Sequence, residues 1–170
     1  LAEDGEGGYY VNMLAQNTAT LDITADDIAN CVTSFNVYDD GVKEGKFSYN
    51  ADGYLTVTAP KGYVLQVSGA VYSGNGYLSV FDGENSQATP LLQVNTFRDG
   101  YDIGTLISTD NAVTFYFQST ANYSSDVSTG LDLTIKLIKM DLALAKDGEG
   151  AYYVNMLAQN TATLNITADD

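Results

Sequence analysis

The sequence has no histidine, no tryptophan, one cysteine and two prolines among its 170 residues. Without histidine, no Ser-His or Cys-His pair is available to activate a nucleophile. The single cysteine, Cys31, cannot form a disulfide within the chain. Paired carboxylates of the glycosidase type are not indicated, because no acidic pair stands apart from turn-forming residues. These absences argue against an enzyme.

Positive charge is also scarce, with 7 basic residues against 22 acidic ones and a net charge of −15. Such a chain repels nucleic acid and anionic lipid, so neither is an expected partner. No apolar run approaches the length that is needed to span a membrane, so membrane insertion is not expected. The acidic surface would attract cations, but its carboxylates are spread along the chain.

What is present is an internal repeat. Residues 1–27 align without gaps onto residues 144–170, an offset of 143 residues (144 − 1), and 24 of the 27 positions are identical. The differences are Glu3 against Lys146, Gly8 against Ala151, and Asp22 against Asn165. A repeat of this fidelity indicates one full unit of a tandem array followed by the opening of the next.

Apolar residues recur with a period of two in most of the other segments. "LDLTIKL" places Leu131, Leu133, Ile135 and Leu137 on one face, and "AVTFYFQ", "YLTVTA", "YVLQVSG", "YLSVF" and "SFNVYD" alternate likewise. Gly, Asn and Asp separate these runs, which is typical of short strands with one solvated face. Only "ADDIANCV" favours a helical turn. The segment "TLDIT" predicts Leu21 and Ile23 inside and Asp22 outside.

About ten such strands predict an all-β fold, an antiparallel β-sandwich or jelly roll repeated in tandem. We expect one sandwich over residues 8–139, a connector over 140–150, and the start of the next unit over 151–170.

Several short motifs, in order, resemble those of CUB domains. They are Tyr38-Asp39-Asp40-Gly41, Phe81-Asp82-Gly83, Phe117 to Ser119, and Gly130-Leu131. The similarity is greater to CUB-like repeats of large secreted bacterial proteins, and it covers roughly residues 35–137. It implies a jelly-roll sandwich and an extracellular, non-catalytic binding or assembly module.

Many CUB domains bind calcium at one end of the sandwich, but this sequence departs from the ligand pattern that the resemblance implies. Gly76 precedes Tyr77-Leu78 where an Asp is usual, Thr120 follows Ser119, and Val71 or Tyr72 lies near the Glu position. The disulfides of animal CUB domains are absent as well.

Two kinds of binding site remain as candidates. The first is calcium, the only cofactor considered, since acidic side chains on turns supply oxygen ligands; the alternative interpretation is that these residues only form turns, because their spacing does not match an EF-hand. The second is sugar, stacked on tyrosines, although strand tyrosines mostly pack within sheets. The calcium candidates are Asp39, Asp40, Glu44, Asp52 and Asp82, the stacking candidates are Tyr72, Tyr77 and Tyr101, and a smaller acidic cluster is Asp99, Asp102 and Asp110.

The second copy cannot occupy the same place as the first within one sandwich. Its strands should therefore complete a neighbouring unit, in series along the chain or by strand addition. The assembly residues are Tyr152, Tyr153, Val154, Met156, Leu164 and Ile166.

Two functions follow from these patterns. The first is a structural repeat of an extracellular bacterial filament or surface stalk, assembled head-to-tail from units of the same chain. The alternative is an adhesin module that presents sites for carbohydrate or host protein multivalently.

Overall fold

The computed structural model describes residues 1–13, 18–30, 32–39, 51–119, 130–140, 145–146 and 148–153. Within these residues strands dominate, and the one short helix is α1 (Ala25–Ala29). The strands are β1 (Ala2–Glu3), β2 (Tyr9–Asn12), β3 (Thr18–Asp22), β4 (Ser34–Tyr38), β5 (Asp52–Thr58), β6 (Tyr63–Asp82), β7 (Thr89–Ile107), β8 (Ala112–Ser119), β9 (Leu131–Lys139), β10 (Ala145–Lys146) and β11 (Tyr152–Tyr153). Among the described residues, no helix has the length and apolarity needed to cross a membrane.

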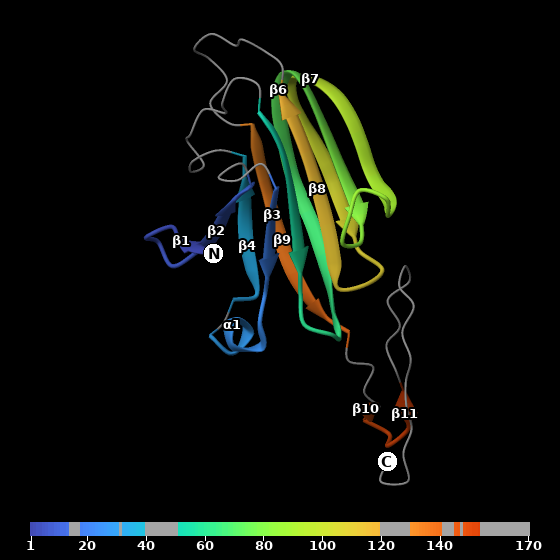
Figure 1. The fold of residues 1–170 in the computed structure, drawn as a ribbon. Helices are drawn as coiled ribbons and strands as arrows, with labels where there is room; N and C mark the ends of the chain where they lie inside the picture. The colour runs from blue at the N-terminus through green and yellow to red at the C-terminus, as the bar shows by residue number, and fades with distance from the viewer. Residues whose placement is uncertain are drawn as a thin grey trace.

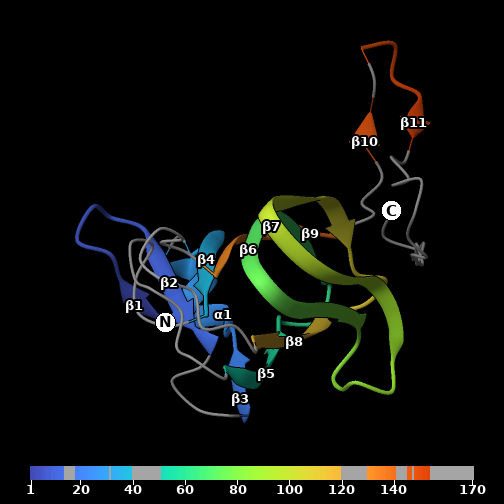
Figure 2. The ribbon, with the colours of Figure 1, turned by 90° about the horizontal axis from the view of Figure 1, so that it is seen from above.

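Nine strands are hydrogen-bonded in the order β1-β2-β4-β9-β6-β8-β5-β3, with β7 along β6 (Figure 1). The first half of β6 pairs with β9, and its second half pairs with β8. Because β6 and β7 run together along both halves, they bend as one ribbon from one layer into the other (Figure 2). The first sheet thus holds β1, β2, β4, β9 and one half of the ribbon, and the second holds β3, β5, β8 and the other half.

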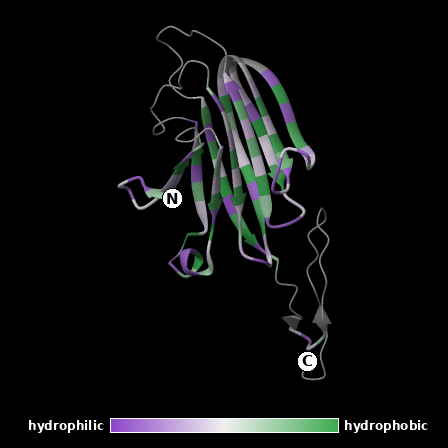
Figure 3. Cartoon of the chain, in the orientation of Figure 1, coloured by the Kyte–Doolittle hydropathy of each residue, from purple (hydrophilic) through white to green (hydrophobic). Residues whose placement is uncertain are grey.

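The core lies between these layers. Leu131, Leu133 and Ile135 of the first sheet and Leu55 and Phe115 of the second have no exposed surface. Figure 3 shows the alternation of apolar and polar residues along the strands. The apolar side chains point inward and fill the space between the layers. The predicted all-β sandwich and the predicted inward faces of β5, β8 and β9 are confirmed.

The structure differs from the sequence prediction in two respects. The segments "YVLQVSG" and "YLSVF" were expected to be separate strands, yet both lie in β6. In addition, two pairs at the sheet edges are parallel, β2 with β4 and β3 with β5, where an antiparallel sandwich was expected. Both parallel strands, β2 and β3, belong to the first copy of the repeated segment.

The first copy therefore contributes β1 and β2 to one edge of the first sheet and β3 to the edge of the second. Its residues also enter the core, where Met13 is fully buried and Ile23 is 4% exposed. Leu21 packs against the core and Asp22 is exposed, as predicted. The predicted helical turn is α1, which begins with a capping box between Thr24 and Asp27.

The chain leaves the sandwich beside the place where β4 begins. β9 runs antiparallel to β4, and the backbone N–H of Leu137 donates to the carbonyl of Thr33 (2.9 Å). β2 runs parallel to β4 and starts level with the first residues of that strand, since Tyr10 pairs with Asn36. Tyr10, near the start of β2, is consequently level with Thr134 in the middle of β9, and β9 continues to Lys139 before the chain leaves the sandwich.

Candidate functional site

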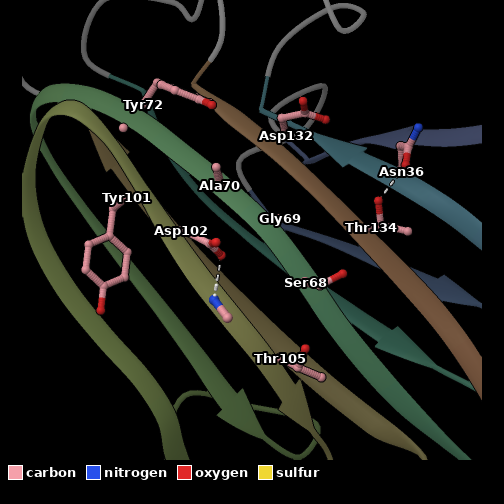
Figure 4. A pocket seen from close by; sticks show the side chains of 12 residues that line it. Asn36, Ser68, Gly69, Ala70, Tyr72, Tyr101, Asp102, Thr105, Asp132 and Thr134 are labelled. Atoms are coloured by element: carbon pink, nitrogen blue, oxygen red, sulfur yellow. Dashed lines mark hydrogen bonds between the residues drawn. The ribbon is translucent and has the colours of Figure 1, made fainter.

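A groove of about 870 Å³ lies on the outer face of the first sheet (Figure 4). Its size falls within the range of small-molecule sites, roughly 300–1,000 Å³. Strands β4, β9, β6 and β7 contribute its walls. The lining residues are Asn36, Ser68, Gly69, Ala70, Tyr72, Gly100, Tyr101, Asp102, Gly104, Thr105, Asp132 and Thr134.

The groove is hollow because small residues form its floor. Gly69 has φ +121°, and a Cβ there would lie 2.2 Å from the carbonyl oxygen of Asp132. Glycine is therefore required where β6 passes closest to β9. Its neighbours Ser68 and Ala70 are also small, so little side-chain volume rises above this part of the sheet.

Hydrogen-bonding groups line both sides of the floor. On the β4–β9 side, the Thr134 hydroxyl donates to Asn36 Oδ1 (3.0 Å), and Asn36 Nδ2 donates to the Tyr38 hydroxyl (3.1 Å). On the β7 side, the backbone N–H of Gly104 donates to Asp102 Oδ1 (2.8 Å). These contacts fix the orientation of the amide and of one carboxylate.

One tyrosine, Tyr72, adds aromatic surface to the groove where β6 and β7 approach the bend. Tyr72 lies against the backbone of β7, because a Cβ on Gly100 would come within 2.4 Å of Tyr72 Cε1. Gly100, at φ +84°, leaves room for this ring. Tyr101 is 42% exposed, which is unusual for a large side chain in the described residues. Tyr101 borders the groove, but it pairs with the buried Val71 and lies two residues from the buried Ile103, so its side chain points to the other face of the sheet. The structure therefore does not bring the three stacking candidates together into one aromatic surface.

The charge of the groove has one sign. Asp102 and Asp132 are its charged lining residues, and no lysine or arginine belongs to the lining. The site consequently disfavours anions.

Tyr77, the third stacking candidate, lies elsewhere, on the outer face of the second sheet. Its ring packs on Tyr116 (centroids 5.8 Å apart), which in turn stacks on Tyr54 (4.5 Å, 25° between planes). Burial in this cluster, together with the charge of Asp52, raises the pKa of Tyr116 to about 12. The Tyr77 ring is engaged by its neighbours, which fits sheet packing.

The calcium candidates that are described do not form one cluster. Asp39 is 2% exposed and accepts from the backbone N–H of Leu131 (2.9 Å). Asp52 begins β5 at the same end of the sandwich, but Asp82 ends β6 at the opposite end, where both its oxygens accept from Thr109 (2.8 Å each). Among the described residues no group of three acidic or cysteine side chains is arranged to hold a metal. Asp40 and Glu44 lie outside the described residues, so calcium binding there stays a prediction.

The second copy of the repeated segment forms a hairpin of its own. β10 pairs with β11 through Ala145↔Tyr153 and Lys146↔Tyr152. The first copy pairs through Ala2↔Tyr10 and Glu3↔Tyr9, which are the same positions 143 residues earlier. The register of the hairpin is therefore identical in both copies, and β10 lies within the stretch that was expected to be a connector.

The surroundings of the two hairpins differ. β2 continues the first sheet by pairing with β4, whereas β10 and β11 make a two-stranded sheet of their own, apart from the sandwich in both views (Figures 1 and 2). Of the assembly residues, Tyr152 and Tyr153 form β11, and Val154, Met156, Leu164 and Ile166 lie outside the described residues.

Sequence reasoning nominated Tyr72, Tyr101 and Asp102 among the lining residues and missed the others, of which Asn36, Asp132 and Thr134 carry polar side chains on the β4–β9 side. These last three occupy outward positions of strands whose alternation was recognised. The alternation predicts that these side chains face outward. It does not predict that β4 and β9, which are almost a hundred residues apart in sequence, are neighbours in the sheet.

Comparison with known proteins identifies the class of fold. No protein-family model matches the sequence, and no curated protein is significantly similar to it. The CUB1-EGF-CUB2 domains of rat MASP-1 match with a TM-score of 0.51 and 12% identity, over 83% of this chain and 54% of that one. The full extracellular region of zebrafish Gpr126/Adgrg6 matches with a TM-score of 0.47 and 14% identity, over 72% of this chain and 15% of that one.

The chain has a CUB-like β-sandwich fold. It spans about half the length of the rat fragment and about a seventh of the zebrafish region.

Proposed function

We propose that this chain is a non-catalytic structural repeat of an extracellular filament or stalk, in which each repeated segment completes the following unit. The observation that carries the proposal is the shared hairpin register of β1–β2 and β10–β11. Two copies that form the same local structure are suited to the same partner strand. The extracellular setting rests on the CUB-like fold.

One sandwich offers a single place for this segment. The segment supplies β1 and β2 to one edge of the first sheet and β3 to the edge of the second, and it places Met13 and Ile23 in the core. These places are filled by the first copy, so the second copy needs the β4 and β5 of another unit. Such a contact joins two different surfaces, the repeated segment of one unit and the sheet edges of the next. Contacts of this heterologous kind extend as open chains.

A longer chain tests the proposal directly. We suggest extending the sequence by a second copy of residues 28–143, which gives the second segment its own β4 and β5. In the 170-residue chain the backbone amides around Tyr152–Asn155 should exchange with solvent rapidly. In the extended chain they should become about a hundredfold more protected, equivalent to about 3 kcal/mol, and match those of Tyr9–Asn12.

The matched control is Val154→Asp in the extended chain, which places a charge at the position equivalent to Val11, a residue that packs against the core. It should lower the melting temperature of the second unit and leave the first unchanged. Equal exchange of the second segment in both chains would refute the completion of a neighbouring unit. Electron microscopy of chains with several units should show regularly spaced sandwiches. Irregular coils would refute the filament but would not contradict the pairing of each repeated segment with the following unit.

A further inference from the structure

The second copy of the repeated segment is tied to the sandwich by a short connector. Met140 follows β9, and its backbone N–H donates to the carbonyl of Gly62 (2.6 Å), so the chain is still attached to the sandwich at this residue. The next strand, β10, begins at Ala145. Five Cα–Cα steps (145 − 140) join Met140 to Ala145, and at about 3.6 Å per step the connector reaches at most about 18 Å.

To complete the unit from which it extends, the second copy would have to bring Ala145 to the place of Ala2. In the strand order β9-β4-β2-β1, Ala2 lies in the same row as Thr134 of β9. Met140 is six residues beyond Thr134 (140 − 134), which corresponds to about 20 Å along the strand. β1 is three strand spacings away from β9, about 14 Å, so the straight line from Met140 to Ala2 measures about 24 Å.

This distance exceeds the reach of the connector, and the direction of the strands is unfavourable as well. β1 runs the same way as β9, because β1 and β9 are both antiparallel to the parallel pair β2 and β4. A chain that leaves β9 would therefore have to pass back beyond Ala2 and reverse before it could run as β1. Figure 1 shows the β10–β11 hairpin beyond the end of β9, apart from the sandwich.

We infer that the second copy cannot complete the unit from which it extends, and that a chain whose first copy is displaced takes the second copy of another molecule of the same chain. The inference rests on the proposed completion of neighbouring units, and it adds the partner and the head-to-tail direction. Met156 and Ile166 of the donor would take the places of Met13 and Ile23 in the acceptor's core. A connector that cannot span two sites gives an effective concentration near zero for closure, so pairing between molecules is favoured.

The test displaces the first copy within the full 170-residue chain. Met13→Asp combined with Ile23→Asp places two carboxylates in the core, so the first copy no longer fits, whereas the second copy keeps its apolar residues. Light scattering after size exclusion should give a monomer for the parent. The mass of the double variant should at least double and should rise with protein concentration. A monomeric double variant that melts cooperatively would overturn the inference and would leave the proposed function standing.

Two controls separate exchange of segments from aggregation of a destabilised chain. Adding Met156→Asp and Ile166→Asp to the double variant should abolish the oligomers, because neither copy then fits, and the net charge of −15 in the parent already opposes aggregation. An excess of the parent chain should shorten the oligomers, since its second copy fills an acceptor while its own acceptor place is occupied. Oligomers that respond to neither change would be aggregates and would overturn the inference.

A longer connector tests the geometry itself. Inserting twelve Gly and Ser residues after Asp141 of the double variant gives the connector a root-mean-square span of about 22 Å, close to the distance to be crossed. The second copy should then complete its own unit, and the chain should be a monomer that melts cooperatively. A variant that stays oligomeric would overturn the inference, because connector length would not decide the partner. A variant that is unfolded would overturn the proposed function as well, because the second copy would not fill this place in any unit.

Discussion

The two copies of the repeated segment share their sequence and their hairpin register, but only the first has neighbouring strands. In the first copy β2 and β3 pair with β4 and β5, and the segment reaches the core. In the second copy the described residues form only the β10–β11 hairpin. The comparison shows which features depend on local sequence and which depend on neighbouring strands. The turn between the two short strands determines the hairpin register, whereas burial of the segment requires the edge of a sandwich.

The largest expected difference between the copies concerns the buried methionine. Met13→Ala should lower the free energy of unfolding by about 2–5 kcal/mol, because it opens a cavity in the core around a fully buried side chain. The matched variant Met156→Ala should leave the unfolding of the 170-residue chain unchanged, since Met13 already fills this place. Urea denaturation at low protein concentration measures both. A comparable loss in Met156→Ala would mean that the second copy also packs in a core.

A smaller difference is expected at the start of α1. The Thr24 hydroxyl accepts from the backbone N–H of Asp27 (3.2 Å), so Thr24→Ala should cost about 1 kcal/mol through loss of the cap. Thr167→Ala, the equivalent change in the second copy, should have no measurable effect on thermal unfolding of the same chain. Equal shifts in melting temperature for the two variants would contradict the distinction between the copies.

The same cap predicts a dependence on pH. The Thr24 hydroxyl and backbone N–H both donate to the Asp27 carboxylate, and they hold the pKa of Asp27 below its ordinary value of 3.8. A lowered pKa stabilises the folded state above pH 3.8, and this contribution is lost as the pH falls through the lowered value. Asp27→Asn should therefore have a lower free energy of unfolding than the parent near neutral pH, and denaturation at a series of pH values should show this difference disappearing in acid. A difference in unfolding free energy that persists below the lowered pKa would mean that the Asp27 carboxylate is not its cause.

The smallest effect is expected when the first copy is converted into the second. The triple variant Glu3→Lys, Gly8→Ala and Asp22→Asn should stay within about 0.5 kcal/mol of the parent in chemical denaturation. Glu3 is exposed, and Asn keeps the acceptor oxygen that receives the Thr58 hydroxyl at position 22. The Asp4 carboxylate that faces Gly8 accepts from the backbone N–H groups of Glu6 and Gly8, but these bonds are exposed, so water can replace them when the carboxylate moves for the Cβ of Ala. A loss of several kcal/mol would show that the second copy no longer fits this place.

Much of the fold was predictable from the alternation of apolar residues, because each strand buries one face. The continuity of β6 was not. Its inward residues are Leu65, Val67 and Val71 before the bend and Leu78 and Val80 after it, so the phase of the alternation changes from odd to even positions. The register shifts where β6 pairs with β7 cause this change, and a pattern with a changed phase looks like two strands.

β7 was missed for a related reason. It is an edge strand, most of its described side chains are at least partly exposed, and Pro90 interrupts its start. Proline is tolerated at an edge because one side of the strand needs no hydrogen-bonding partner. Alternation is weak where neither face is deeply buried, so the sequence carried little signal for this strand.

For the candidate sites, the sequence identified side chains with suitable chemistry but did not predict which of them lie close together. Tyr72 and Tyr101 could be nominated as aromatic residues on strands, yet only the pairing of β6 with β7 shows that they point to opposite faces of the sheet, since Tyr101 pairs with the buried Val71. Tyr77, five residues beyond Tyr72, lies on the other layer because the ribbon bends between them. Spacing along a chain does not report which layer of a sandwich a side chain reaches.

In a series of such units, the repeated segment would be the first part of each unit to bear a pull along the chain. Its strands β2 and β3 are joined to their unit only through β4 and β5, whereas the strands that carry most of the core pair on both sides. Optical tweezers should accordingly record a first extension event in which β2 and β3 separate from β4 and β5, at a force below the one that unfolds the rest of the sandwich.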